Sequence, residues 1–115
     1  MTLDDLSEKK VAVLGFGQEG QATVRYLLRH GFNPVLFDQR TTIEGLSNLP
    51  EQIETVLGPD YLTNLAGFDI AFRSPGIWRN TPALLAAEKA GLVITSQTKW
   101  FMDRYRDQTI GITGT

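Results

Sequence analysis

The sequence predicts an α/β fold, in which a parallel sheet of about five strands carries helices on both faces. Two observations lead to this prediction. Short apolar runs alternate with amphipathic segments about five times along the chain, and this order is typical of parallel sheets with right-handed crossovers. The first apolar run is also followed at once by a glycine-rich turn that opens a helical segment.

The first half of the chain supplies three of the predicted strands. They are compact apolar runs at residues 10–14, 34–38 and 53–57, each with the length and composition of a strand. Residues 18–30 carry apolar side chains at helical spacing. Gly31 then ends the helix, because glycine tolerates the left-handed conformation that often follows a helix.

The second half continues the alternation of strands and helices. The predicted elements are a short helix at 61–65, a strand at 68–72, a helix capped by Thr81 that ends at Gly91, a strand at 92–95, a helix starting after Ser96 and a strand at 109–113. We place a boundary in the charged stretch before the last strand. Residues 1–107 are then one domain, and residues 108–115 begin a second domain that is cut short.

Composition and charge exclude several classes of protein. Of the 115 residues, 42% are hydrophobic and 21% are charged, with a formal net charge of −2. These values are close to those of soluble globular domains, and there is no basic excess for nucleic acid. No apolar run approaches the roughly 20 residues of a membrane helix. We expect a cytoplasmic domain that binds neither nucleic acid nor membrane.

The chain has no cysteine and one histidine, His30. Disulfides and thiolate metal sites are therefore excluded, and one histidine leaves little room for a histidine metal site or a Ser-His-Asp triad. We expect no metal site and no catalytic residue in these 115 residues. His30 is expected at the surface, at the end of a helix.

The strongest motif is Gly15-Phe16-Gly17-Gln18-Glu19-Gly20, which follows a strand and opens a helix. In a Rossmann-like fold the first glycine permits the tight turn, the second lets the backbone approach a ligand, and the third lets the helix pack on the strand. The free amides at the helix start favour a phosphate group. If the Glu19 carboxylate points to solvent, its negative charge interacts favourably with the helix dipole. If it points at the ligand, it would repel a phosphate.

Asp38 ends the second strand, 18 residues after Gly20. An aspartate there can accept hydrogen bonds from a ribose diol or from a base N–H group. Because it lies at a strand end, we expect it to be exposed. Arg40 follows two residues later, where it would stack on a base, meet a phosphate or remain in water.

Two further loops fall where a ligand would bind. Ser74-Pro75-Gly76-Ile77 follows the fourth strand, and ligands of open parallel sheets lie beyond the carboxyl ends of the strands. Gly76 offers a bare amide to an anion there. The run from Ile110 to Thr115 reads Ile-Gly-Ile-Thr-Gly-Thr, which is similar to the start of a phosphate loop.

In this order the four motifs resemble the Mur ligases, and most closely those that add D-glutamate. Members of that family open with a strand and a glycine-rich turn, carry Asp-x-Arg after the second strand, here Asp38-Gln39-Arg40, and Ser-Pro-Gly-Ile after the fourth. A helix with an aromatic pair, here Trp100-Phe101, then leads into Gly-x-Thr-Gly-Thr. The resemblance spans nearly the whole chain.

The resemblance implies a function for the domain. In the full-length ligase, ATP with magnesium phosphorylates the carboxylate of a UDP-linked muramoyl peptide, and the amine of D-glutamate then attacks it. The first domain holds the UDP end, the remaining domains do the chemistry, and residues 1–115 alone would be inactive and bind no ATP or magnesium. The implied UDP-sugar-binding residues are Gly17, Gln18, Glu19, Asp38, Gln39, Arg40, Ser74 and Gly76. The implied partial ATP site is Gly111, Thr113, Gly114 and Thr115.

Two other classes of protein use the same glycine turn. One is the NAD-binding domain of an oxidoreductase, and the other is a nucleotide-sensing regulatory module. The NAD-binding domain also accounts for Asp38 as well as a UDP-binding domain does. Neither accounts for the Ser74–Ile77 loop or for the phosphate-loop pattern at Gly111.

Overall fold

The computed structural model describes residues 9–46, 49, 52–74, 76–77 and 80–96. Its elements in chain order are β1 (Val11–Leu14), α1 (Gln18–Arg29), β2 (Val35–Asp38), β3 (Glu54–Leu57), the 3-10 helix η3 (Tyr61–Asn64), β4 (Ile70–Arg73), α2 (Pro82–Lys89) and β5 (Val93–Thr95). The strands and helices that the sequence predicts in this part of the chain are therefore confirmed.

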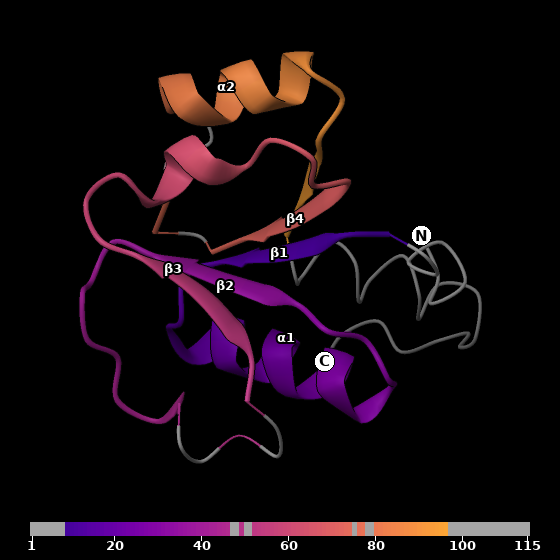
Figure 1. Ribbon diagram of the computed structural model, residues 1–115, viewed down its shortest axis with the longest axis vertical. Helices are drawn as coiled ribbons and strands as arrows, with labels where there is room; N and C mark the ends of the chain where they lie inside the picture. The colour runs from indigo at the N-terminus through magenta and orange to yellow at the C-terminus, as the bar shows by residue number, and fades with distance from the viewer. Residues whose placement is uncertain (1–8, 47–48, 50–51, 75, 78–79, 97–115) are drawn as a thin grey trace, which may run out of the picture.

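The described strands form one sheet in the order β3-β2-β1-β4-β5, and every pair is parallel. In Figure 1, α1 lies on one face of this sheet, while η3 and α2 lie on the other. The predicted α/β fold, Rossmann-like with helices on both faces, is confirmed. From β1 the chain moves outward through β2 to β3 and then crosses back to β4, so the strand order reverses between β1 and β4.

The central strand β1 is buried on both sides. Val11 and Val13 belong to the core cluster that includes the apolar side of α1, whereas Ala12 and Leu14 belong to the cluster that includes Leu84 of α2. A parallel strand covered by helices on both faces needs a continuous apolar run. The sequence Val-Ala-Val-Leu meets that requirement, and it anchors the loop that follows β1.

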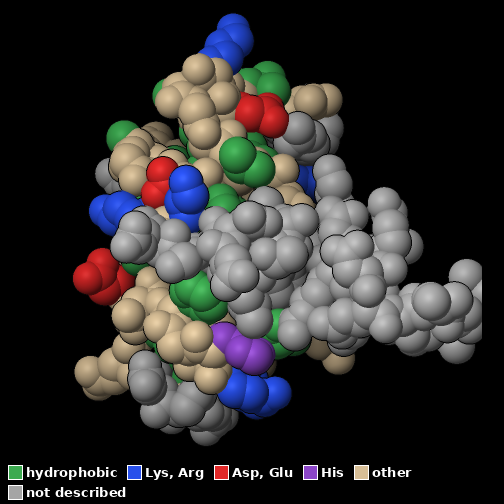
Figure 2. Space-filling view, turned by 90° about the vertical axis from the view of Figure 1, so that its right-hand side faces the viewer, with side chains coloured by type: hydrophobic (Ala, Val, Ile, Leu, Met, Phe, Trp, Pro, Cys, Tyr) green, Lys and Arg blue, Asp and Glu red, His purple; other side chains and the backbone are tan. Residues whose placement is uncertain are grey.

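Helix α1 ends at Arg29, and the exposed His30 is its C-cap residue, as the sequence predicts. His30, the single histidine of the chain, is the purple side chain at the surface in Figure 2. None of the helices in the described ranges is long and apolar enough to cross a lipid bilayer. The expected helix after Ser96, the strand at 109–113 and the boundary after residue 107 lie outside the described residues.

Candidate functional site

The three glycines of the turn after β1 differ in what surrounds them. Gly15 has a φ of +95°, and a Cβ on it would meet the Ser74 Oγ at 2.7 Å. A Cβ on Gly20 would overlap the carbonyl oxygen of Gly15, so α1 can approach the turn only without a side chain there. Around Gly17 there is open space within 4 Å. Two glycines thus serve packing, and Gly17 leaves the backbone accessible.

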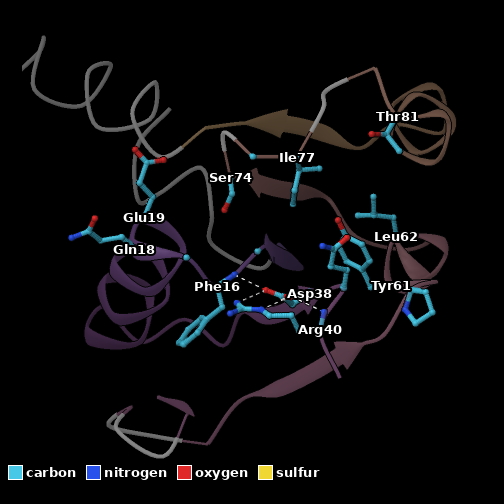
Figure 3. A pocket seen from close by; sticks show the side chains of 15 residues that line it. Phe16, Gln18, Glu19, Asp38, Arg40, Tyr61, Leu62, Ser74, Ile77 and Thr81 are labelled. Carbon is cyan, nitrogen blue, oxygen red and sulfur yellow. Dashed lines mark hydrogen bonds and ion pairs between the residues drawn. The ribbon is translucent and has the colours of Figure 1, made fainter. Parts of the chain in front are cut away.

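The first turn of α1 presents backbone amides. Gly17 is the N-cap residue and makes no side-chain capping hydrogen bond. The Gln21 amide donates to the Gly17 carbonyl at 2.9 Å, which leaves the amides of Gln18, Glu19 and Gly20 without acceptors in the helix. In Figure 3 the side chains of Gln18 and Glu19 extend away from Asp38 and Arg40. The Glu19 carboxylate therefore does not point at that part of the site.

Asp38 is buried, with 5% of its surface exposed, so the prediction of an exposed strand-end aspartate was wrong. Its Oδ2 accepts hydrogen bonds from the Phe16 amide at 2.9 Å and from the Arg40 Nη2 at 2.8 Å. Its Oδ1 accepts from the Arg40 amide at 2.8 Å and from the Arg40 Nε at 3.0 Å. These bonds occupy the roughly four lone-pair positions of a carboxylate. Asp38 thus ties the glycine-rich turn to the end of β2.

The charge of Asp38 is stabilised by its partners. Burial on its own raises the pKa of the carboxyl group, but the hydrogen bonds from the Arg40 side chain and backbone and from the Phe16 amide outweigh it. The pKa of Asp38 therefore lies below its ordinary value of 3.8. Half of the Arg40 side chain, 51%, stays exposed, so its guanidinium is held along one edge by Asp38 while the rest remains accessible.

The loop after β4 lies beside the glycine-rich turn. The Ser74 amide donates to the Leu14 carbonyl at 3.1 Å, and the Ile77 amide donates to the Ser74 carbonyl at 3.0 Å. The Arg73 Nη1 donates to the Ile77 carbonyl at 2.6 Å. The Arg73 side chain therefore stabilises the loop by binding a backbone carbonyl in it. Pro75, the second residue of the motif, lies outside the described residues.

A cleft of about 710 Å³ lies at the carboxyl ends of β1, β2 and β4 (Figure 3). Pockets for small ligands usually measure about 300–1,000 Å³. The cleft also lies where the strand order reverses, which is the usual ligand position in open parallel sheets. The lining residues are Gly15, Phe16, Gly17, Gln18, Glu19, Asp38, Gln39, Arg40, Pro59, Tyr61, Leu62, Ser74, Gly76, Ile77 and Thr81.

All eight residues that the resemblance implies for the UDP-sugar line this cleft. They are Gly17, Gln18, Glu19, Asp38, Gln39, Arg40, Ser74 and Gly76. The four residues of the expected partial ATP site, Gly111, Thr113, Gly114 and Thr115, lie outside the described residues. Among the described residues, no group of three or more histidine, cysteine, aspartate or glutamate side chains is arranged to hold a metal ion.

Several lining residues were missed by the sequence reasoning. Pro59, Tyr61 and Leu62 follow the carboxyl end of β3, and Thr81 precedes α2. The turn signal Gly58-Pro59-Asp60 marks the end of a parallel strand, so it was available as a pointer to the same edge of the sheet. Phe16 is almost fully buried in the core cluster on the α1 side, and its amide, not its ring, serves the site.

Comparison with known proteins identifies the family to which the chain belongs. Residues 9–96 match the family model of the Mur ligase MurD-like N-terminal domain. The UDP-N-acetylmuramoylalanine--D-glutamate ligase of Acetivibrio thermocellus is 36% identical over 95% of this chain and 24% of its own length. Those of Ruminiclostridium cellulolyticum and Clostridium novyi are each 34% identical over 96% of this chain. The chain spans about a quarter of the length of these relatives, and it belongs to the family of MurD-like N-terminal domains of Mur ligases.

Proposed function

We propose that this domain binds the UDP end of a UDP-N-acetylmuramoyl substrate for a ligase that adds D-glutamate. One observation carries the proposal most directly. An open cleft joins the accessible backbone at Gly17 to the anchored guanidinium of Arg40, at the position where nucleotides bind in this kind of fold. The relatives support it, because their names specify a UDP-N-acetylmuramoyl substrate and D-glutamate.

The diphosphate lies at the start of α1 in this proposal. Amides that lack acceptors in the helix, together with the partial positive charge of the helix end, favour an anion. Gly17 leaves room for the anion to reach the backbone, since a Cβ there would meet nothing within 4 Å. Gln18 and Glu19 take part through their backbone amides, which lie in the first turn of α1 and have no acceptors in the helix.

The uracil lies near Arg40 and Gln39, and the sugar lies near Ser74 and Gly76. Arg40 offers a half-exposed guanidinium whose orientation is set by Asp38. A guanidinium held along one edge still presents a flat face, which suits stacking on a base. Asp38 then serves the substrate through Arg40 and the Phe16 amide, because its own lone pairs are already occupied.

ATP and magnesium are expected in the full-length ligase, together with its remaining domains. The residues expected to start the ATP site, Gly111 to Thr115, lie outside the described residues. Nothing in the cleft between α1 and η3 is needed for phosphoryl transfer in this proposal. The cleft binds and orients the nucleotide end of a substrate whose reacting carboxylate lies elsewhere. We also propose a cytoplasmic location, where such substrates are made available to the ligase.

Calorimetric titration of the protein with UDP, UDP-N-acetylmuramoyl-L-alanine and NAD tests this proposal. Both uridine compounds should bind more tightly than NAD, because the proposed contacts are made with a uracil base and a diphosphate. Tighter binding of NAD would favour the oxidoreductase alternative and contradict the proposal. Failure of both uridine compounds to bind would contradict it equally.

A further inference from the structure

Tyr61 occupies the wall of the cleft that faces the start of α1. It is the first residue of η3, and with Leu62 it lines the cleft. In Figure 3 these two residues lie on the opposite side of the cleft from Gln18 and Glu19, with Asp38 and Arg40 between the two sides. Neither the sequence motifs nor the proposed function assigns a role to Tyr61.

Two backbone hydrogen bonds connect Tyr61 to the end of β2 at Asp38. The Gly58 amide donates to the Asp38 carbonyl at 3.0 Å, and the Tyr61 amide donates to the Gly58 carbonyl at 3.2 Å. Thr63 secures the 3-10 turn, since its hydroxyl donates to the Asp60 carbonyl at 2.7 Å. The residue that orients Arg40 thus also fixes the turn that carries Tyr61.

The ring of Tyr61 is suited to a flat ligand. It is half-buried and packs against the core cluster that contains Phe37, Leu65 and Leu84, so its position is supported from below. Burial raises the pKa of the Tyr61 hydroxyl above 10.0, and the negative charge of Asp38 raises it further. The side chain therefore stays neutral at physiological pH and presents an aromatic surface with a polar tip.

The two ends of the cleft differ in chemistry. The α1 end offers backbone amides, and the η3 end offers the side chains of Tyr61 and Leu62. A nucleoside diphosphate has the same division, with an anionic group at one end and a flat base at the other. When the phosphates lie at α1, the base is directed toward Arg40 and the η3 wall.

We propose that Tyr61 is a specificity-determining residue that packs its ring against the base of the bound nucleotide, on the η3 side of Arg40. This inference rests on the proposed binding of a UDP-linked substrate, and it assigns the base end of that site. The contact is made by the ring and does not need the hydroxyl. Loss of a base–aromatic contact commonly weakens binding by about tenfold or more.

The test uses three variants of the protein, each titrated with UDP. Tyr61→Phe keeps the ring and should bind UDP within about twofold of the unmodified protein. Tyr61→Leu keeps an apolar side chain without the ring, and it should bind about tenfold more weakly or worse. Phe32→Leu is the matched control, because Phe32 packs on the α1-side core cluster and does not line the cleft. Its affinity should not change.

A spectroscopic readout separates direct contact from an indirect effect on the fold. The uracil H5 and H6 proton resonances of bound UDP should shift upfield in the unmodified protein and in Tyr61→Phe, because they lie over an aromatic ring. They should lose that shift in Tyr61→Leu. This measurement on the unmodified protein remains decisive even if Tyr61→Leu does not fold.

The outcomes separate this inference from the proposed function. If the unmodified protein does not bind UDP, the proposed function fails. If it binds UDP without an upfield shift of the uracil protons, or if Tyr61→Leu binds equally well, only the role of Tyr61 is overturned. A Tyr61→Phe variant as weak as Tyr61→Leu would also overturn it, because the hydroxyl would then be the contact.

Discussion

Helices α1 and α2 lie on opposite faces of the same sheet, but they begin in different ways. The start of α1 is Gly17, an N-cap residue without a side chain, and it opens on the cleft. The start of α2 is Thr81 followed by Pro82, and proline has no amide hydrogen to offer an anion. The comparison teaches that glycine at the helix start, and not the helix itself, makes one end of the cleft suited to phosphate.

The two helices also differ in how they are held. Helix α1 buries five residues, Gly20, Thr23, Val24, Leu27 and Leu28, whereas α2 buries only Leu84 among its eight. A helix with one buried anchor depends on that anchor. Helix α1 is instead held by several buried residues. It can approach the preceding turn because Gly20 has no side chain.

The largest effect is expected at the single anchor of α2. Leu84→Ala should lower the free energy of unfolding by about 2–5 kcal/mol, the range for removing a large buried side chain. Leu85→Ala is the matched control, because Leu85 is 40% exposed and Leu84 is fully buried. Urea unfolding of both variants measures the loss in the free energy of unfolding. Equal losses would show that α2 is not held by Leu84.

The next effect separates packing from binding in the turn before α1. Gly20→Ala should destabilise the domain by about 3 kcal/mol, because its Cβ would overlap the Gly15 carbonyl oxygen. Gly17→Ala should leave stability nearly unchanged and weaken UDP binding by about tenfold, since the methyl group would occupy the space open to a phosphate. Unfolding curves and UDP titrations distinguish the two. Unchanged UDP affinity in Gly17→Ala would remove Gly17 from the site.

A double-mutant cycle tests how Asp38 acts. Asp38→Asn should weaken UDP binding by about 1–3 kcal/mol, and Arg40→Met should cause a similar loss. If Asp38 acts through Arg40, the double variant will be little worse than Arg40→Met alone. Fully additive losses would show that Asp38 meets the ligand itself. Because Asp38 is buried and accepts the Phe16 amide, its replacement should also lower stability.

The stabilising effect of Asp38 should depend on pH in a defined direction. Its pKa is lower in the folded protein than the ordinary value of 3.8, so folding favours the charged form. The contribution is therefore fully present above the ordinary value and is lost as pH falls through the lower, folded-state pKa. The stability difference between the unmodified protein and Asp38→Asn should be constant near neutral pH and shrink below about pH 4. A constant difference down to pH 2 would contradict this.

The smallest effect is expected at the loop on the α2 side of the cleft. Arg73→Met should cost about 0.5–1.5 kcal/mol of stability, the usual value of one hydrogen bond, because it removes the contact with the Ile77 carbonyl. UDP affinity should fall by less than in Gly17→Ala. A larger loss of affinity than in Gly17→Ala would reverse the ranking of the two ends of the cleft.

Much of the fold was predictable because its signals are local. The run Val11–Leu14 and the glycines after it specify a buried strand, a tight turn and a helix start within ten residues. The order of these units then fixes a parallel sheet. The eight residues expected around the UDP-sugar could be predicted to lie together for the same reason, since each lies at or just after the carboxyl end of a strand or begins the helix that follows it.

The rest depends mainly on contacts that the sequence pattern does not specify, several of them between residues distant in sequence. Asp38 looks exposed as a strand-end aspartate, but its burial comes from Phe16, 22 positions earlier, and from Arg40 folding back over it. Tyr61 reaches the cleft because β3 pairs with β2 and the Gly58 amide joins the Asp38 carbonyl. The contact between Asp38 and Phe16 has no local sequence signal. The turn signal at residues 58–60 points to this edge of the sheet, but it does not place the Tyr61 side chain in the cleft.

Backbone amide shifts on titration with UDP test the central claim most directly. With ¹⁵N-labelled protein, the amides of Gln18, Glu19 and Gly20 should shift with UDP and should shift little with uridine, which lacks the phosphates. The amides of Ala83 and Leu84 at the start of α2 should stay in place with both compounds. Shifts at α2 as large as those at α1, or equal shifts with uridine and UDP, would contradict a phosphate site at the first turn of α1.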